Sequence, residues 1–368
     1  MVPFVDLGAA QAEIEPELNA ALMRVTASGR YLLGAELERF EQEFAAYCGT
    51  RHCVGVASGL SAIELALRAA GIGSGDEVIV PAYTFIATWL AVSRTGAKPV
   101  PVDVRQSTYN IDARQIADAI TPRTAAMVPV HLRGEPAEMD MIDEIAAAHD
   151  LLVIEDAAQA HGATHRDRRV GGLGVAAAFS FYPSKNLGAV GDAGAVTTDD
   201  DALAEKVRLL RNYGMRAKYE VEEVGVNSRL GEVQAAALGV KLPYLDGWNR
   251  TRSELADRYR SSLAGSEALT LPEVEGWADP VWHLFVVNHP DRDACGAALR
   301  NRGIETMVHY PVLPHLSKAY LDHGWPPGSL PVAERLAGST LSLPMYPGLT
   351  GEQVETVAAA VLETLPPA

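Results

Sequence analysis

The sequence predicts an α/β fold with a mostly parallel sheet covered by helices on both faces. Short apolar strands and amphipathic helices alternate from residue 36 to about residue 198, and such βαβ alternation is typical of a parallel sheet between helical layers. Long helical segments follow, so we place a domain boundary near residue 245. The chain then divides into a large domain, 1–245, and a smaller C-terminal α+β domain, 246–368, with the option that residues 1–30 pack on the small domain.

Each element is predicted from the spacing of its apolar residues. Leu37, Phe40 and Phe44 lie at helical spacing and Gly49 follows as a stop signal, so we expect a helix over 36–49. The same criteria predict helices at 59–71, 84–96, 112–120, 138–150, 201–214, 291–303 and, with an interruption near Pro243, 228–265. Strands are predicted at 52–58, 75–82, 98–104, 124–132, 151–158 and 282–288.

The composition excludes several function classes. The 368 residues are 48% hydrophobic and carry a formal net charge of −16. This acidic balance argues against binding to nucleic acid or to an anionic membrane, although a local basic pocket remains possible. Cys48, Cys53 and Cys295 have no metal-ligand spacing, so we expect buried thiols and no metal site. We see no signal peptide and no membrane span, and therefore predict a soluble, cytoplasmic protein.

A lone lysine stands in the stretch AFSFYPSKNLGAVGDAGAV, residues 178–196. The stretch opens like a buried strand and ends in small residues, with Lys185 between them. A charge among apolar residues is costly. Lys185 is therefore either a solvated turn lysine or a lysine whose chemistry requires an unprotonated amine.

Three further motifs follow strands, where open α/β sheets bind their ligands. Residues 58–61, Ser-Gly-Leu-Ser, open a helix and could hold a phosphate, or could be an ordinary helix cap. Phe85 could stack on a flat ring, or belong to the core. Asp156 ends a buried strand, where a carboxylate needs a cationic partner, although it could also cap a turn.

Together these features match the requirements of pyridoxal phosphate (PLP). Lys185 would form an imine with the aldehyde, and Asp156 would keep the pyridine nitrogen protonated, which makes the ring an electron sink. The helix start at 58–61 would anchor the phosphate. Desolvation and a nearby cation would lower the pKa of Lys185, as imine formation requires.

At this point the sequence resembles the nucleotide-sugar aminotransferases of the DegT/DnrJ/StrS type, a branch of the fold-type I PLP enzymes. Matching segments run along almost the whole chain, and the most specific are VIEDAAQAHGA (153–163) and FSFYPSKNLGA (179–189). The resemblance implies a three-layer αβα large domain of the PLP-dependent transferase type. It also implies catalytic roles for Lys185, which binds the cofactor and moves protons, and for Asp156.

The resemblance also implies which residues contact the cofactor. Gly59, Leu60 and Ser180 are expected to hold the phosphate. Phe85 is expected to stack on the ring, and Gln159 to contact the ring hydroxyl. The phosphate motif is commonly SGT or NGT in this family, so Leu60 here offers its backbone N–H and no hydroxyl.

Further implied contacts come from a partner subunit and from the substrate site. Asn227 of the GxNSR motif is expected to reach the phosphate of the partner subunit, which would place the active site at a homodimer interface. The family's HLYG segment reads HLRG here, and we expect Arg133 to be a solvated loop residue. The residues implied to lie near the sugar and its diphosphate are Tyr182, Arg229, His309, Tyr310 and His315.

The expected reaction is transfer of an amino group from an amino acid, L-glutamate, to a keto group of a nucleotide-diphosphate-linked deoxy sugar. The product would be an amino sugar for secondary-metabolite or surface-glycan biosynthesis. Related dehydratases carry histidine at the position of Lys185, so the lysine favours transamination. The motif at 179–189 favours C3 amination of a 6-deoxy keto-hexose, with C4 amination as the alternative. A PLP-binding regulator and an NAD-dependent oxidoreductase are the other classes, and the latter lacks its glycine fingerprint.

Overall fold

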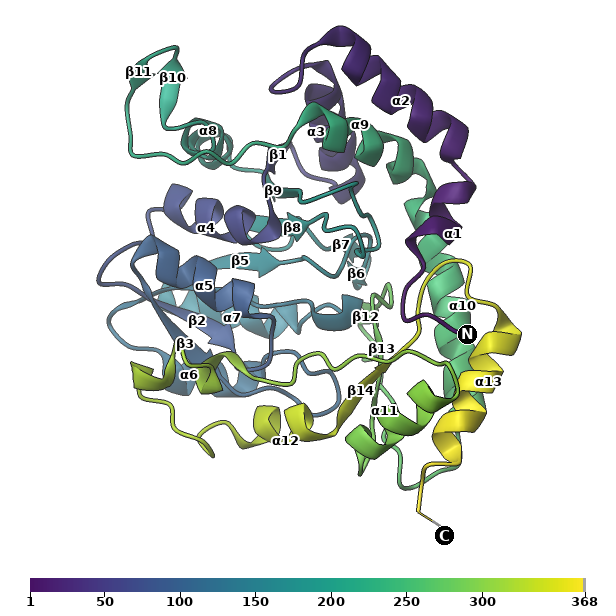
Figure 1. Cartoon of the computed structure of the whole chain (residues 1–368). Coiled ribbons are helices and arrows are strands. Elements are labelled where there is room, and N and C mark those ends of the chain that lie inside the picture. Colours follow the sequence, from purple (N-terminus) through teal and green to yellow (C-terminus); the bar gives the residue numbers. More distant parts are fainter. Residues whose placement is uncertain (367–368) are drawn as a thin grey trace.

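A seven-stranded sheet forms the centre of the large domain (Figure 1). The computed structural model describes residues 1–366. The strands lie in the order β1-β9-β8-β5-β4-β2-β3, and β9 runs antiparallel to both of its neighbours. Their bounds are β1 (His52–Val56), β2 (Glu77–Pro81), β3 (Lys98–Val102), β4 (Thr124–Met127), β5 (Leu152–Asp156), β8 (Ala176–Ser180) and β9 (Gly194–Thr198). The predicted mostly parallel sheet is confirmed.

Helices cover both faces of the sheet, as the βαβ alternation predicts. One face carries α4 (Gly59–Ala69), α5 (Ile86–Thr95) and α8 (Asp201–Leu210), whose buried residues share one apolar cluster. The other face carries α3 (Ala35–Cys48), α6 (Ile116–Ala119), α7 (Met139–His149) and α9 (Glu232–Lys241), which share a second cluster. The sheet and its two helical layers form the three-layer αβα arrangement.

Two predicted helices differ in the structure. The helix expected at 112–120 is a 3-10 turn, η1 (Ala113–Gln115), followed by the single turn α6. The helix expected at 228–265 begins at Glu232 and is interrupted by the 3-10 turn η3 (Leu242–Tyr244). Pro243 lies in that turn and has no backbone N–H, which explains the interruption predicted there.

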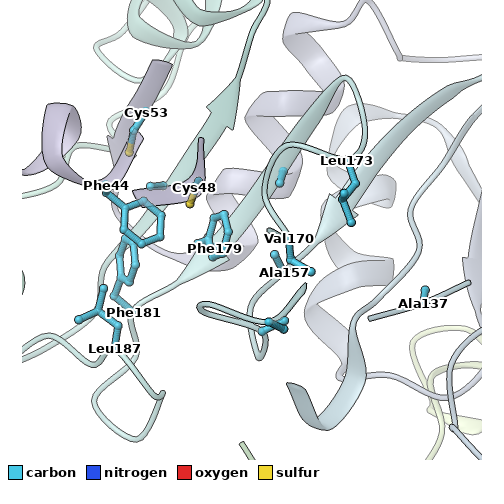
Figure 2. Close-up of a cluster of buried hydrophobic side chains, with 14 of the residues drawn as sticks. Phe44, Cys48, Cys53, Ala137, Ala157, Val170, Leu173, Phe179, Phe181 and Leu187 are labelled. Carbon is cyan, nitrogen blue, oxygen red and sulfur yellow. The ribbon is translucent and has the colours of Figure 1, made fainter. Parts of the chain in front are cut away.

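Aromatic side chains fix the strand that leads to the lysine loop. Figure 2 shows Phe44 of α3 against Phe179 and Phe181, and the ring centroids lie 5.0 and 5.2 Å from that of Phe44 in edge-to-face geometry. All three rings are fully buried. The loop is closed by backbone hydrogen bonds from Phe181 to Ala193 and from Ala189 to Phe181. Packing and hydrogen bonds therefore hold both ends of the segment that carries Lys185.

The C-terminal part has its own apolar cluster. It is built on α10 (Leu245–Leu263), α11 (Arg292–Asn301) and α13 (Gly351–Leu362), with the antiparallel pair β13 (Phe285–Asn288) and β14 (Thr340–Leu343) and the helix α12 (Pro331–Ser339) beside it. The helix α10 begins at Leu245, and the division of the chain into domains near this residue stays a prediction. The turns η4 (Pro314–Leu316) and η5 (Leu321–His323) precede α12.

The N-terminal segment contacts both parts of the chain. Val2 pairs with Ile304 and belongs to the C-terminal cluster, after which α1 (Leu7–Ala12) and α2 (Glu15–Ser28) follow. In α2, Ala21 and Val25 pack against Ala236 of α9 in the large domain. Glu13 also accepts a hydrogen bond of 3.4 Å from Trp248 Nε1 of the C-terminal part, and packing of residues 1–30 on a small domain stays a prediction.

Short strands complete the fold. The pair β10 (Met215–Ala217) and β11 (Glu220–Val221) forms a hairpin that projects from the body of the molecule beside α8 (Figure 1). A small sheet joins β6 (Thr164–His165), β7 (Arg168–Arg169) and β12 (Ala278–Asp279). All three cysteines are free and buried. No helix within residues 1–366 combines the length and the apolar character that crossing a membrane requires.

Candidate active site

A cavity of about 530 Å³ lies where the large and small domains meet, at the carboxyl ends of the parallel strands. This is the edge at which open α/β sheets bind ligands. The cavity brings together residues that are far apart in the sequence. The predicted site residues that line it are Gly59, Leu60, Phe85, Asp156, Gln159, Ser180, Tyr182, Lys185, His309 and Tyr310.

The start of α4 forms one end of the cavity. Ser58 is the N-cap, and its hydroxyl accepts a hydrogen bond from the amide of Ser61. The amide N–H groups of Gly59 and Leu60 have no protein partner in the part of the chain that is described. A Cβ at position 59 would lie 2.6 Å from Cβ of Ser180, so only glycine fits. The unpartnered amides at a helix N-terminus suit a phosphate group.

Two neighbouring acidic residues at the end of β5 have different surroundings. Glu155 is fully buried and accepts hydrogen bonds from His131 Nε2 and from three backbone amides at 171–174. Asp156 lines the cavity, since consecutive strand residues point to opposite faces. Its Oδ2 accepts a hydrogen bond of 2.7 Å from Thr88 Oγ1, and its Oδ1 accepts one of 3.2 Å from the amide of Ala158. Burial raises the pKa of Asp156, and these hydrogen bonds oppose the shift.

Lys185 lines the cavity from the loop between β8 and β9. Its backbone amide donates to the carbonyl of Tyr182 over 2.8 Å, which closes a turn around the lysine. Burial of the ammonium group lowers the pKa of Lys185 from 10.5 to about 8, and the Asp156 carboxylate opposes this shift. About one tenth of the amine is then unprotonated at pH 7, and this is the form that can act as a nucleophile.

Gln159 is held by hydrogen bonds on both ends of its amide. Oε1 accepts from the backbone amide of Arg133 over 2.6 Å, and Nε2 donates to the hydroxyl of Tyr310 over 3.0 Å. The ring of Phe85 lies beside that of Tyr310, with the centroids 5.5 Å apart, and is 54% exposed. The side chain of Phe85 is therefore available to a ligand ring in the cavity and does not belong to the core.

The expectation that Arg133 is solvated is wrong. The side chain is 5% exposed, its guanidinium stacks on the ring of Tyr109 at 3.8 Å, and Nη2 donates to the carbonyl of Thr108. Glu135 lies 3.7 Å away. Arg133 does not line the cavity; only its backbone is in contact with a cavity residue, Gln159. A cation on an aromatic face is stabilised without full hydrogen bonding, which explains the burial.

Three predicted residues do not line this cavity of the single chain. Asn227 is exposed and pairs with Asn212 through the backbone. Arg229 donates to the side chain of Asn212 over 3.2 Å. His315 is fully buried, with Nε2 3.2 Å from Glu334. Of the residues that sequence reasoning assigned to the substrate, Tyr182, His309 and Tyr310 are therefore the ones on the cavity wall.

Comparison with known families decides what kind of protein carries this cavity. The model of the DegT/DnrJ/EryC1/StrS aminotransferase family matches residues 12–362. The chain belongs to this family. The resemblance inferred from the lysine and aspartate motifs is confirmed.

Two similar relatives of this aminotransferase-family chain span almost its whole length. A dTDP-3-amino-3,4,6-trideoxy-alpha-D-glucose transaminase of Streptomyces venezuelae is 56% identical over 98% of this chain and 96% of its own. The erythromycin biosynthesis sensory transduction protein EryC1 of Saccharopolyspora erythraea is 55% identical over 98% of each chain. The match over both full lengths makes the residue-by-residue comparison meaningful along the whole cavity.

Two solved structures are similar in fold as well as in sequence. The crystal structure of S. venezuelae DesV in complex with a ketimine intermediate has a TM-score of 0.97 and is 56% identical over 98% of both chains. That of NtdA from Bacillus subtilis, with bound cofactor PMP, has a TM-score of 0.91 and is 34% identical, covering 99% of this chain and 85% of the other. These matches confirm the predicted fold type I architecture for this family member.

The residues of this DegT/DnrJ/EryC1/StrS family member fit PLP. The unpartnered amides of Gly59 and Leu60 suit its phosphate, Asp156 suits a protonated ring nitrogen, and Lys185 suits its aldehyde.

Sequence reasoning missed Thr88, which donates a hydrogen bond to Asp156, although it lies one helical turn after Phe85. It also missed His283, a cavity residue nearly 100 positions after Lys185 and without a local signal. No group of three or more potential metal ligands occurs within residues 1–366.

Proposed function

We propose that the protein is a PLP-dependent, homodimeric, cytoplasmic enzyme that transfers an amino group from L-glutamate to the C3 keto group of a dTDP-linked deoxy sugar. The observation that carries this proposal is the placement of Lys185 and Asp156 on one cavity of an aminotransferase-family fold. The C3 position and the dTDP handle are supported by the name of the S. venezuelae relative, a 3-amino-sugar transaminase at 56% identity. Amination at C4 has no such support among the relatives described above.

The chain's own residues divide the work of the reaction. When bound, PLP supplies a ring that withdraws electrons from the reacting carbon. Lys185 removes and returns the proton at that carbon, because its amine has a pKa of about 8. Asp156 would offer its carboxylate at the end of β5 to the protonated ring nitrogen of the bound cofactor. Phe85 and Gln159 would hold the ring of the bound cofactor, and contacts with the diphosphate of the sugar would help to position its keto carbon.

Turnover with the two regioisomers tests the proposal. Because transamination is reversible, purified protein with PLP and 2-oxoglutarate is incubated with dTDP-3-amino and dTDP-4-amino deoxy sugars, and products are read by NMR. We expect glutamate to form from the 3-amino sugar at least about tenfold faster. Preference for the 4-amino sugar would contradict the regiochemistry. Absence of turnover with every amino donor and sugar would contradict the enzymatic function and favour a role of the kind that the name of EryC1 describes.

The homodimer is supported by the position of Asn227 and the β10–β11 hairpin. Asn227 is exposed and lies at the base of this hairpin, away from the cavity of its own chain. The hairpin carries exposed apolar side chains, with Tyr219 84% and Val221 62% exposed. Exposed apolar surface of this kind is typical of an interface. Asn227 would complete the phosphate contacts of the partner subunit.

Mixing two impaired variants at a PLP concentration that does not saturate Asn227→Ala tests the shared site. Asn227→Ala weakens cofactor retention, and Lys185→Ala removes the amine. A mixed dimer of the two variants has one site with both Lys185 and Asn227, provided that Asn227 acts across the interface. We therefore expect unfolding and refolding of the mixture to restore about a quarter of the wild-type activity. The separately refolded variants are the control, and no gain on mixing would contradict the shared site.

A further inference from the structure

Asn186, the residue that follows the lysine, holds a histidine of the small domain. Its side chain is buried, and its Oδ1 lies 3.1 Å from Nδ1 of His283. Its Nδ2 donates to Oδ1 of Asn249 over 2.9 Å and to the carbonyl of Val281 over 2.8 Å. The loop that carries Lys185 and the segment that carries His283 are therefore joined at one amide group.

These hydrogen bonds fix the protons on the His283 ring. The carbonyl of Val281 can only accept, so the group of Asn186 that contacts it must be the NH₂. Asn249 is oriented in the same way, because its own Nδ2 donates to the carbonyl of His161. Oδ1 of Asn186 is then the acceptor in its contact with His283, and Nδ1 carries the hydrogen. In a neutral ring, the lone pair lies on Nε2.

His283 and Lys185 line the same cavity with complementary unpaired groups. Nε2 of His283 makes no hydrogen bond to any residue from 1 to 366, and neither does Nζ of Lys185. One atom is an acceptor and the other a donor. The four-carbon stem of lysine is flexible, so its ammonium group can turn within the cavity to meet an acceptor on the wall.

We propose that Nε2 of His283 is the hydrogen-bond acceptor that holds the Lys185 ammonium group in those steps in which the lysine is both detached from the cofactor and protonated. His283 is then a positioning residue, and Asn186 sets its tautomer. The proposal deepens the proposed function, since an amino-group transfer requires the lysine to leave the cofactor and return. A fixed place for the released lysine keeps its amine near the reacting carbon.

The surroundings of His283 keep the ring neutral, as an acceptor must be. Burial, followed by the positive charge of Lys185, lowers the pKa of His283 well below its usual value, and Arg252, His309 and His161 act in the same direction. Arg252 is buried and bonded to backbone carbonyls, among them that of His283. The Asp156 carboxylate raises the pKa of Lys185, against the effect of burial. A neutral acceptor can bind the ammonium without being protonated itself.

The tautomer can be measured in the full-length protein without PLP or substrate. Long-range ¹H–¹⁵N correlation spectra of protein labelled with ¹⁵N-histidine distinguish the two neutral tautomers, and the loss of one signal set in His283→Gln assigns His283. We expect a neutral ring with hydrogen on Nδ1 at pH 7. A hydrogen on Nε2, or a protonated ring, would overturn the proposal, and this test needs no variant to be active.

The contact itself is tested by titrating Lys185 in the same cofactor-free protein. Competitive acetylation at several pH values, followed by mass analysis of the peptide containing Lys185, gives the pKa of its amine. His283→Phe keeps a ring but has no acceptor, so we expect the pKa of Lys185 to fall by about one unit. His283→Gln places a carbonyl oxygen near the position of Nε2. This variant should therefore return the pKa of Lys185 most of the way to its wild-type value.

Two outcomes would overturn the proposal. One is an unchanged pKa of Lys185 in a folded His283→Phe variant, and the other is an equal fall in the Phe and Gln variants. The acetylation readout does not depend on turnover. Failure of the proposed function would appear instead as a wild-type protein with the expected titration and no amino transfer.

Discussion

Replacing Lys185 with alanine is expected to lower kcat for amino transfer by at least about 10⁴-fold. The variant loses the amine that attaches the cofactor and also the base that removes the substrate proton, so both half-reactions stop. The fold should remain, because no described side chain bonds to Nζ and the turn at Lys185 is closed by its backbone amide. Single-turnover spectra with glutamate and with the amino sugar measure the two halves separately.

Two further variants separate the roles of the lysine. Lys185→Arg keeps a positive charge that cannot be removed near neutral pH, so it should be as inactive as the alanine variant. Lys318→Ala changes an exposed lysine and should keep the wild-type rate. If Lys185→Arg retained appreciable turnover, charge alone would be sufficient and the assignment of Lys185 as a base would be wrong.

Replacing Asp156 with asparagine is expected to lower kcat by about 10²–10⁴-fold. Removing one partner of a buried ion pair costs about 3–5 kcal/mol, which corresponds to this range of rates. Asparagine preserves the shape and can still accept the hydrogen bond from Thr88, so a loss of rate would report the missing negative charge at position 156. The measurement is the pre-steady-state rate with saturating PLP and glutamate.

The adjacent residue provides a control for Asp156. Glu155→Gln also removes one buried carboxylate from β5, but that group bonds His131 and backbone amides on the opposite face of the sheet. It should lower the thermal unfolding temperature and leave the rate per folded molecule within about threefold. Equal losses of rate in the two variants would show that the effect of Asp156 is structural.

The sequence was sufficient to predict most strands of the seven-stranded sheet and the residues that follow them. The carboxyl ends of parallel strands share one edge, so short motifs at 58–61, Phe85 and Asp156 could be assigned to one site before their distances were known. Lys185 was identified because a charge among small and apolar residues needs a reason. Each of these signals is local, and the structure brings all of them to one cavity.

Contacts between distant segments could not be predicted in the same way. Arg133 is buried because its guanidinium stacks on the ring of Tyr109, which lies 24 positions earlier in the chain. No local sequence pattern predicts this contact. His283 reaches the cavity through a contact with Asn186 across nearly 100 residues. Asn227 is not among the residues that line the cavity of its own chain, and the role that we propose for it involves a second copy of the chain. Tertiary packing determines where these side chains lie, and the spacing of apolar residues along the sequence does not predict that packing.

The closeness of Gly59 to Ser180 has a practical consequence for protein engineering. Any side chain at 59 would collide with the end of β8. Position 60 is free of this restriction, because Leu60 directs its side chain toward the apolar cluster beneath α4 while its N–H remains at the helix start. A library built around the proposed phosphate site can therefore vary residue 60 and should keep glycine at 59, since every residue except proline retains the main-chain N–H at position 60.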